Sequence, residues 1–167
     1  MAISDSKRRE LQCLLAFRQQ FDSQEPEQLV GVLMESLAVT KKNVYEAIAW
    51  WQSSQEQLAH ARSLLAQVSE SYELERLGQV EQAILLTSAE ELLRSSGQSK
   101  RIIQDAIKLA RKYATPEAGG LVNALLDGLC RRLEGANVDD REIVASAKAL
   151  EEAEADAHQA VQQRDPA

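Results

Sequence analysis

Residues 77–127 decide the predicted fold, and they read LGQVEQAILLTSAEELLRSSGQSKRIIQDAIKLARKYATPEAGGLVNALLD. Three apolar patterns with the period of an α-helix follow one another in this stretch. Gly97 is typical of the position just after a helix end, and Thr115-Pro116 is a cap followed by proline at a first helical position. We therefore predict three successive helices, at about 79–97, 99–113 and 116–135.

The middle helix of the three is divided by charge. Projected at about 100° per residue, its apolar residues share one half of its surface, and the other half carries Arg101, Lys108, Arg111 and Lys112. Residues 94–112 contain six basic residues and one acidic residue, Asp105. We predict that the apolar half faces the core and the cationic half faces water. The cationic half is either an ordinary solvated surface or an anion-binding surface.

The rest of the chain also follows helical spacing. We predict a first helix from 4–6 to about Phe21, a second from Pro26, a third over 41–68 with a bend or break near Ser53–Ser54, and a tail helix from 139 or 140 to about 161. Strong helix formers are abundant, whereas runs of β-branched residues are nearly absent. The predicted fold class is all-α, a compact helical bundle of six to seven helices.

The net charge of −7 is unevenly distributed along the 167 residues. Residues 139–167 contain eight acidic and three basic side chains, which leaves 18 acidic and 16 basic side chains in residues 1–138. The acidity therefore belongs largely to the C-terminal segment, and the body is close to neutral. We predict one helical domain over residues 1–135 and an acidic, weakly docked helical tail over residues 136–167.

Several classes of protein are disfavoured by the sequence. No apolar run approaches the ~20 residues that cross a bilayer, and the N-terminus lacks the apolar segment of a signal peptide. Cys13 and Cys130 lie within helical patterns, which favours free thiols in a reducing cytoplasm over a disulfide. We find no spacing typical of a metal site, and the consecutive Glu90 and Glu91 do not converge on a substrate. We expect a cytoplasmic protein without catalytic activity, metal or cofactor.

Three motifs in residues 77–127 resemble the NusB family of transcription antitermination factors. LGQVEQAIL at 77–85 is similar to the opening of the family's C-terminal helical region. IIQDAIKLARKY at 102–113 resembles its Asn/Glu-Ala-apolar-Glu-Leu-Ala-Lys helix, and LVNALLD at 121–127 resembles its Phe-Val-Asn-Gly-Val-Leu-Asp run. More weakly, KRRELQCLLAF at 7–17 resembles its arginine-rich start. The resemblance covers residues 7–133 in order and implies two packed helical halves.

The resemblance also implies a function. Family members are non-enzymatic adaptors that bind boxA-type single-stranded leader RNA. They do so together with a small-ribosomal-subunit protein, NusE in this role. The complex joins the RNA polymerase elongation complex and suppresses premature termination, notably in ribosomal RNA operons. We therefore expect an RNA-binding transcription antitermination factor.

The family's RNA-binding positions fall on a few residues of this chain. The arginine-rich start corresponds to Lys7, Arg8 and Arg9, and these cations could contact phosphate. Leu121 stands at an RNA-facing phenylalanine of the family, after Gly120, which replaces a lysine. The partner-binding positions correspond to Phe17, Glu91, Arg94 and Glu117.

Alternative interpretations stay open at this point. Lys7, Arg8 and Arg9 could be an ordinary solvated N-terminus, although cations oppose the helix dipole there. The loss of the family's phenylalanine removes a stacking surface worth about 1–3 kcal/mol per base, so the chain could be a protein-interaction module that has lost direct RNA binding. A helical domain of an RNA-modifying methyltransferase would need an α/β cofactor domain that the sequence lacks. A homodimer is also left open.

Overall fold

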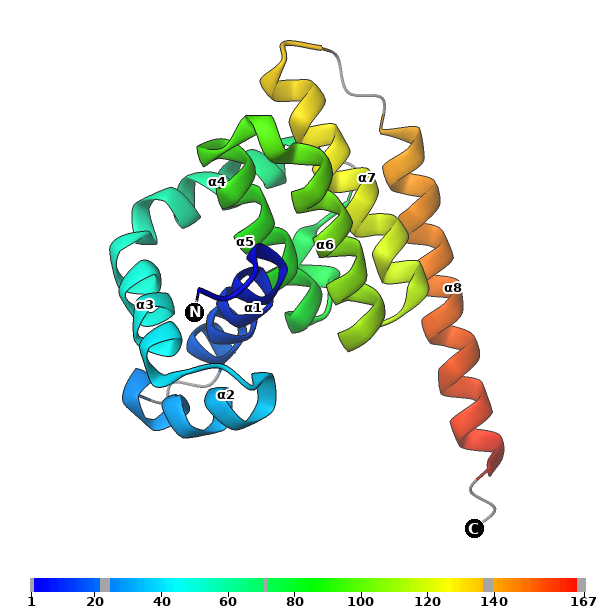
Figure 1. The fold of residues 1–167 in the computed structure, drawn as a ribbon. Helices are drawn as coiled ribbons and strands as arrows, with labels where there is room; N and C mark the ends of the chain where they lie inside the picture. Colours follow the sequence, from blue (N-terminus) through cyan, green and yellow to red (C-terminus); the bar gives the residue numbers. More distant parts are fainter. Residues whose placement is uncertain (1, 22–24, 71, 137–139, 165–167) are drawn as a thin grey trace.

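The computed structural model describes residues 2–21, 25–70, 72–136 and 140–164, and these residues contain helices and no strand (Figure 1). The all-α prediction is confirmed. Eight α-helices are described: α1 (Asp5–Phe21), α2 (Val30–Leu37), α3 (Lys41–Ser53), α4 (Gln55–Val68), α5 (Gln79–Arg94), α6 (Ser99–Tyr113), α7 (Pro116–Leu133) and α8 (Arg141–Arg164). Three short 3-10 helices join them: η1 (Pro26–Leu29), η2 (Leu74–Arg76) and η3 (Ser96–Gln98).

The helix count exceeds the predicted six to seven because the segment 41–68 is two helices. Thr40 caps the start of α3 in a reciprocal capping box with Asn43. Ser54, at φ −108° and ψ 13°, leaves the helical conformation and separates α3 from α4. The Ser53 hydroxyl donates a hydrogen bond to the carbonyl oxygen of Trp50 at 3.2 Å. Such a side-chain bond competes with the backbone hydrogen bonds of the helix and therefore favours a helix end.

The bundle has two hydrophobic cores, which correspond to the two packed halves expected from the family resemblance. The smaller core is built from α1, α2 and α3, with Leu15, Leu33 and Val44 at its centre. The larger core is built mainly from α4 to α8, and α5 lies within it between α1, α4, α6 and α7. α1 contributes to both cores, and Trp51 packs against both. α1 is therefore the element that joins the halves.

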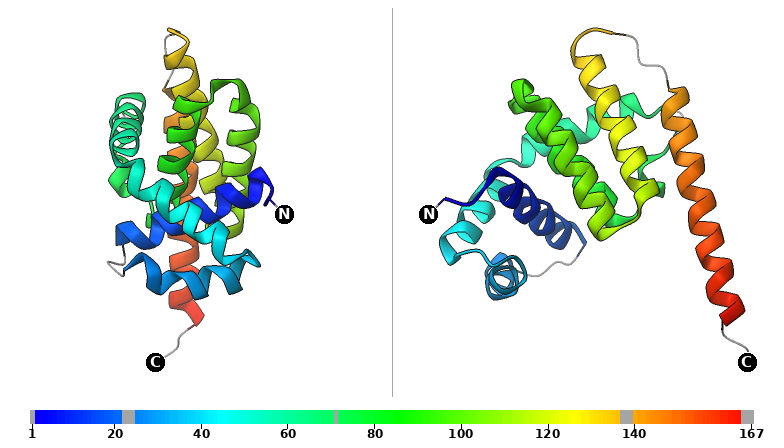
Figure 2. Two further views of the ribbon diagram at one scale, coloured as in Figure 1. Left: turned by 60° about the vertical axis from the view of Figure 1, so that its left-hand side comes forward. Right: turned by 45° about the vertical axis from the view of Figure 1, so that its right-hand side comes forward.

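The C-terminal helix α8 docks along α7 with its first half only (Figures 1 and 2). Ile143, Ala147 and Leu150 are buried in the larger core. The side chains described after Ala153 are all exposed, and this part of α8 extends away from the bundle. The tail therefore has a firmly packed first half and a solvated second half. Across the described residues, no helix combines the length and apolarity needed to span a membrane.

Gly78, just before α5, leaves space that the Glu81 side chain occupies. A Cβ at Gly78 would lie 2.3 Å from a carboxylate oxygen of Glu81, which folds back over the first turn of α5. Real Cβ atoms do not approach other atoms so closely, so the absence of a side chain at Gly78 allows Glu81 to lie there.

Candidate functional site

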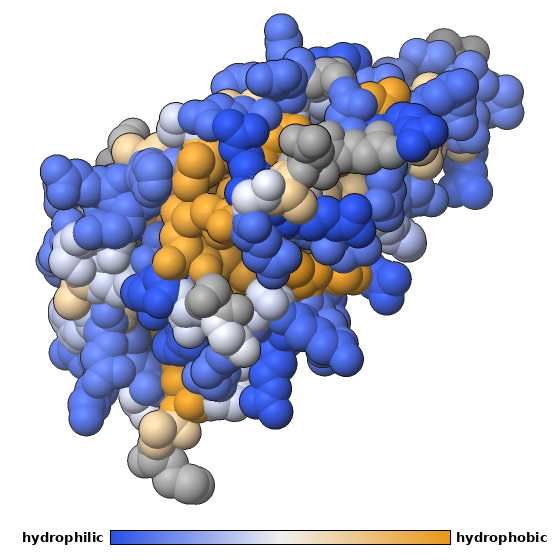
Figure 3. All heavy atoms as spheres, turned by 90° about the horizontal axis from the view of Figure 1, so that it is seen from above, coloured by the Kyte–Doolittle hydropathy of each residue, from blue (hydrophilic) through white to orange (hydrophobic). Residues whose placement is uncertain are grey.

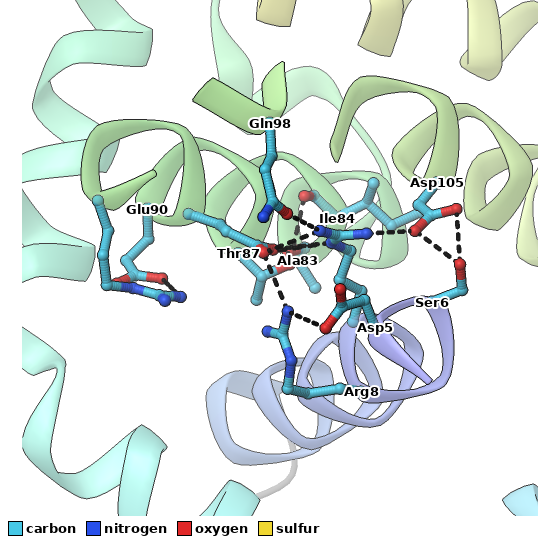
Figure 4. A network of polar contacts seen from close by, with 12 residues as sticks. Asp5, Ser6, Arg8, Ala83, Ile84, Thr87, Glu90, Gln98 and Asp105 are labelled. Carbon is cyan, nitrogen blue, oxygen red and sulfur yellow. Dashed lines mark hydrogen bonds and ion pairs between the residues drawn. The ribbon is translucent and has the colours of Figure 1, made fainter. Parts of the chain in front are cut away.

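The first turns of α1 place three consecutive cations in different surroundings. Because successive helix residues are rotated by about 100°, Lys7, Arg8 and Arg9 cannot share one face. Arg9 points into the bundle, Arg8 lies at its edge and Lys7 lines an open hollow toward α6. Figure 4 shows the part of this site where α1 meets α5 and α6.

Arg9 is buried in an ion-pair network that joins three helices. Only 7% of its surface is exposed. Its guanidinium Nε lies 3.1 Å from Oε2 of Glu91 on α5, and its Nη1 lies 2.7 Å from Oδ2 of Asp105 on α6. Burial by itself lowers the Arg9 pKa, but the hydrogen bonds to both carboxylates outweigh it and raise that pKa. Arg9 is therefore a charged cross-link between α1, α5 and α6.

Arg8 shares one of these carboxylates but remains partly exposed. Its Nη2 lies 3.1 Å from Oε1 of Glu91 and 3.3 Å from Oδ1 of Asp5 (Figure 4). Arg8 and Arg9 therefore stand at the unfavourable end of the α1 dipole because Glu91 and Asp105 supply compensating charge from neighbouring helices.

Two further contacts fasten α1 to α6. The Ser6 hydroxyl donates to Asp105 at 2.9 Å. Glu10 accepts hydrogen bonds at 2.6 Å from both Lys112 Nζ and the Tyr113 hydroxyl. Burial raises the Glu10 pKa, but those hydrogen bonds and the charge of Lys112 reverse the effect and hold the pKa below its ordinary value. Every one of these contacts joins residues about 100 positions apart in the chain.

The RNA-binding residues expected from the resemblance divide into accessible and inaccessible ones. Lys7 and Arg8 keep exposed surface, whereas Arg9 is held in the network. Leu121 has 0% exposure and belongs to the larger core, because the apolar face of α7 includes its position. Gly120 beside it is exposed but offers no side chain. As the molecule is folded, RNA could reach Lys7 and Arg8 but not Arg9 or Leu121.

The residues expected to bind a protein partner do not form one cluster. Glu91 is 5% exposed and neutralised by Arg8 and Arg9, and Phe17 is half-buried against the larger core. Arg94 follows at the end of α5, where its exposed guanidinium pairs with the buried Glu90 at 3.1 Å. Glu117 begins α7 after the other end of α6, so it lies roughly 20 Å from Arg94 along that 15-residue helix.

A partly apolar hollow lies at the C-terminal end of α5, the helix that ends at Arg94. It has a volume of about 330 Å³ where the ends of α5 and α7 meet η3, and Leu92, Cys130 and Leu133 are among its lining residues. Leu133 is 46% exposed, which is unusual for a large apolar side chain. Figure 3 views the molecule from the side of Figure 1 where α7 ends and η3 lies, and it shows apolar surface enclosed by polar side chains.

Sequence reasoning missed the partners of the basic residues. Glu10, Asp105 and Gln98 complete the network; Asp105 stands out as the one acidic residue of the basic segment 94–112, but no local pattern pairs it with Arg9. One signal was available, because cations at the start of a helix need counter-charge from elsewhere. Near the end of α7, Asp127 pairs with Arg131 at 3.0 Å. The predicted free thiols are confirmed, with Cys13 buried and Cys130 half-buried.

Comparison with known proteins gives consistent sequence matches. The model of the NusB family matches residues 7–131. The transcription antitermination protein NusB of Dictyoglomus thermophilum is 35% identical over 75 residues, which are 44% of this chain and 52% of that protein. NusB of Nitratiruptor sp. is 25% identical over 105 residues, covering 63% and 76% of the two chains. The chain thus spans about half the length of the first relative and three quarters of the second.

A solved structure shares the fold. It is a protein chain in the crystal structure of a plectonemic RNA supercoil, with a TM-score of 0.67 and 23% sequence identity. The match covers 79% of this chain and 97% of that chain. Because the family model covers α1 to α7 almost completely and the fold agrees, this chain belongs to the NusB family.

Proposed function

We propose that this protein is a transcription antitermination adaptor without catalytic activity. It binds boxA-type leader RNA together with the small-ribosomal-subunit protein NusE, and the complex acts on elongating RNA polymerase in the cytoplasm. Family membership supports the antitermination role. The observation that carries RNA binding is the basic first turn of α1, where Lys7 and Arg8 remain accessible beside the cationic face of α6.

Phosphate charge is the physical basis of the proposed RNA contact. Lys7 has no carboxylate within 4.0 Å among the described residues, and Arg8 is held by Glu91 and Asp5 but keeps exposed surface. Cations of this kind release counterions when they meet RNA phosphates, which gives affinity without sequence choice. Base contacts must then supply sequence choice. The partner protein is proposed to help provide that choice, because this chain lacks the stacking phenylalanine at Leu121.

The proposed partner surface is the end of α5. Arg94 is half-exposed there, and a partly apolar hollow lined by Leu92 and Leu133 lies at the same end of α5. Arginine and exposed apolar side chains are enriched at protein interfaces. We retain Glu117 and Phe17 as predicted partner contacts from the family resemblance, and Glu91 as the residue that holds α1 against this surface.

Fluorescence polarisation of a labelled boxA RNA tests the proposal. The RNA is titrated with the protein alone, with NusE alone and with both, and a scrambled RNA of the same length is the control. We expect tighter binding of boxA RNA than of scrambled RNA when both proteins are present. Equal binding of the two RNAs would contradict sequence-specific recognition.

One specific observation favours a second candidate function, a protein-interaction module without direct RNA contact. Arg9 and Leu121, two of the four expected RNA-binding residues, are buried. In that case the protein would bind NusE, Lys7→Gln would leave RNA affinity unchanged, and the affinity of the complex for RNA would depend on salt no more steeply than that of NusE alone.

A further inference from the structure

A polar groove runs between the start of α1 and the cationic face of α6. It consists of two adjoining hollows of about 230 and 320 Å³. Both hollows are lined by Ser4, Ser6, Asp105 and Lys108, so they form one continuous groove. Lys7 and Lys112 line one end, and Arg101 lines the other. We refer to it as the α1–α6 groove.

The acidic side chains in the α1–α6 groove are already neutralised. Asp105 is paired with Arg9 at 2.7 Å, Glu10 with Lys112 at 2.6 Å, and Asp5 with Arg8 at 3.3 Å. The remaining cations of the groove are not neutralised in this way. Among the described residues, no carboxylate lies within 4.0 Å of the side-chain nitrogens of Lys7, Arg101 or Lys108. The groove therefore carries an excess of positive charge in a concave surface, which concentrates anions.

The cations on α6 form a line along the groove. Arg101, Lys108 and Lys112 are seven and four residues apart, so they lie within about 40° of one another around the helix axis. The line is about 16 Å long. A stacked nucleic-acid strand advances about 3.4 Å per nucleotide, so a line of this length can contact several phosphates of one strand.

Hydrogen-bond donors accompany the charge. The Ser4 hydroxyl accepts from the backbone N–H of Lys7 at 3.2 Å, and its own hydrogen remains available to an anion. Asp105 is occupied by Ser6 and Arg9 and so presents less charge to the groove. The groove thus combines ammonium, guanidinium and hydroxyl donors, the groups that bind phosphate oxygens.

We propose that the α1–α6 groove holds consecutive backbone phosphates of single-stranded RNA, with Lys7 and Lys108 at its centre and Arg101 at its far end. This inference rests on the proposed RNA-binding function and extends it, because Arg101 and Lys108 are not among the residues that the family resemblance assigns to RNA. The α1–α6 groove runs along α6. It provides phosphate contacts on a chain in which Leu121 and Arg9 are buried.

The test compares cations on one helix. Lys108→Gln and the double variant Arg101→Gln/Lys108→Gln remove charge from the groove. Lys100→Gln is the matched control, because Lys100 is an exposed α6 cation that does not line either hollow. Each protein is titrated, with NusE present, into boxA RNA and into oligouridylate of equal length between 50 and 200 mM KCl. Lys108→Arg is included to ask whether charge alone restores binding.

We expect the single and double variants to reduce the salt dependence of RNA binding, while Lys100→Gln does not. Each lost phosphate contact lowers the slope of log affinity against log salt by about 0.7, so the rise in Kd from 50 to 200 mM shrinks by about 2.6-fold per contact. Lys108→Arg should retain the wild-type slope. Circular dichroism and urea denaturation check that every variant is folded.

The outcomes separate this inference from the proposed function. Wild-type slope and Kd in the double variant, together with weaker binding by Lys7→Gln, would overturn the groove and leave RNA binding intact. Loss of affinity for both RNAs in the groove variants, without any preference for boxA RNA, would support the groove and contradict sequence-specific antitermination. No RNA binding by the wild type, or displacement of RNA by polyglutamate at equal charge concentration, would overturn the groove as an RNA site.

Discussion

α1 meets α5 and α6 along two adjoining edges that differ in their electrostatics. At the inner edge, Arg9, Glu91 and Asp105 are buried and satisfy one another. At the outer edge, Lys7, Arg101 and Lys108 face an open groove without carboxylate partners among the described residues. Lys7 and Arg9 are only two positions apart in the sequence, so composition alone would assign them the same role.

The difference between the two edges follows from the cost of leaving a charge unpaired in each place. Inside the bundle an unpaired charge is very costly, so a buried cation must be matched by carboxylates with good geometry. In an open groove water screens the repulsion between like charges, and unpaired cations are tolerated. The inner edge is therefore expected to hold the fold, and the outer edge is expected to be available to an anionic ligand.

Removing the inner cation should have the largest effect. Arg9→Met would leave Glu91 and Asp105 buried with incomplete compensation, which typically costs about 3–5 kcal/mol of the free energy of unfolding. Urea denaturation followed by far-UV circular dichroism measures the loss. The triple variant Arg9→Met/Glu91→Gln/Asp105→Asn is the control, and it should recover part of that loss. A cost below about 1 kcal/mol would show that the network contributes little to stability.

Glu10→Gln should have a smaller effect that depends on pH. The carboxylate of Glu10 accepts from Lys112 and Tyr113, and charged hydrogen bonds of this kind contribute about 1.5–3 kcal/mol. We expect the lower end of that range, because Lys112 is solvent-exposed. The pKa of Glu10 is lowered in the folded protein, so its contribution is fully present above the unfolded pKa of about 4.3 and disappears as the pH falls through the folded value.

The measurement for Glu10 is the free energy of unfolding of both proteins from pH 7 to pH 3. The difference between wild type and Glu10→Gln should be constant near neutrality and should narrow below about pH 4. Lys7 also lowers the Glu10 pKa through its charge, and Lys7→Gln should therefore move the narrowing slightly toward higher pH. A difference that stays constant down to pH 3 would contradict this assignment.

Most of the fold could be predicted from sequence because helix periodicity and caps are local. The predicted helices at 99–113 and 116–135 agree with α6 and α7 to within a few residues. Thr115 caps α7 through the N–H of Ala118, as predicted. The predicted bend or break near Ser53–Ser54 is confirmed as a full break at Ser54, although the apolar pattern continues across it from α3 into α4. An apolar stripe predicts burial but does not decide whether one helix or two will carry it.

The candidate site was less predictable because its contacts are distant in sequence. Arg9 and Glu91 are 82 positions apart, and no local rule pairs them. Periodicity also left open which side of a basic segment faces a neighbouring helix, so Arg9 and Lys7 could not be distinguished. Leu121 was assigned to RNA by the resemblance, whereas the spacing of apolar residues in the same helix already indicated the core.

Ser6→Ala tests the boundary between the inner and the outer edge. The Ser6 hydroxyl lies at the border and donates to Asp105, and its loss is expected to cost about 1 kcal/mol of unfolding free energy because Arg9 still neutralises that carboxylate. Ser63→Ala on α4 is the matched control, since Ser63 is exposed and its hydroxyl makes no hydrogen bond to a described residue. The control should be neutral or slightly stabilising through helix propensity. Equal effects in both variants would contradict a role for Ser6.

Lys108→Gln should change stability least of all. Because Lys108 has no ion pair within the described residues, its loss removes mainly repulsion from Lys7, and the free energy of unfolding should stay within about 0.5 kcal/mol of wild type. Any gain should vanish in high salt, where that repulsion is screened. Urea denaturation at 50 mM and 500 mM KCl measures both effects. A loss above 1 kcal/mol would mean that the outer edge also holds the fold. A neutral result would mean that folding does not require a cation at Lys108. The charge of Lys108 is then available to bind a ligand.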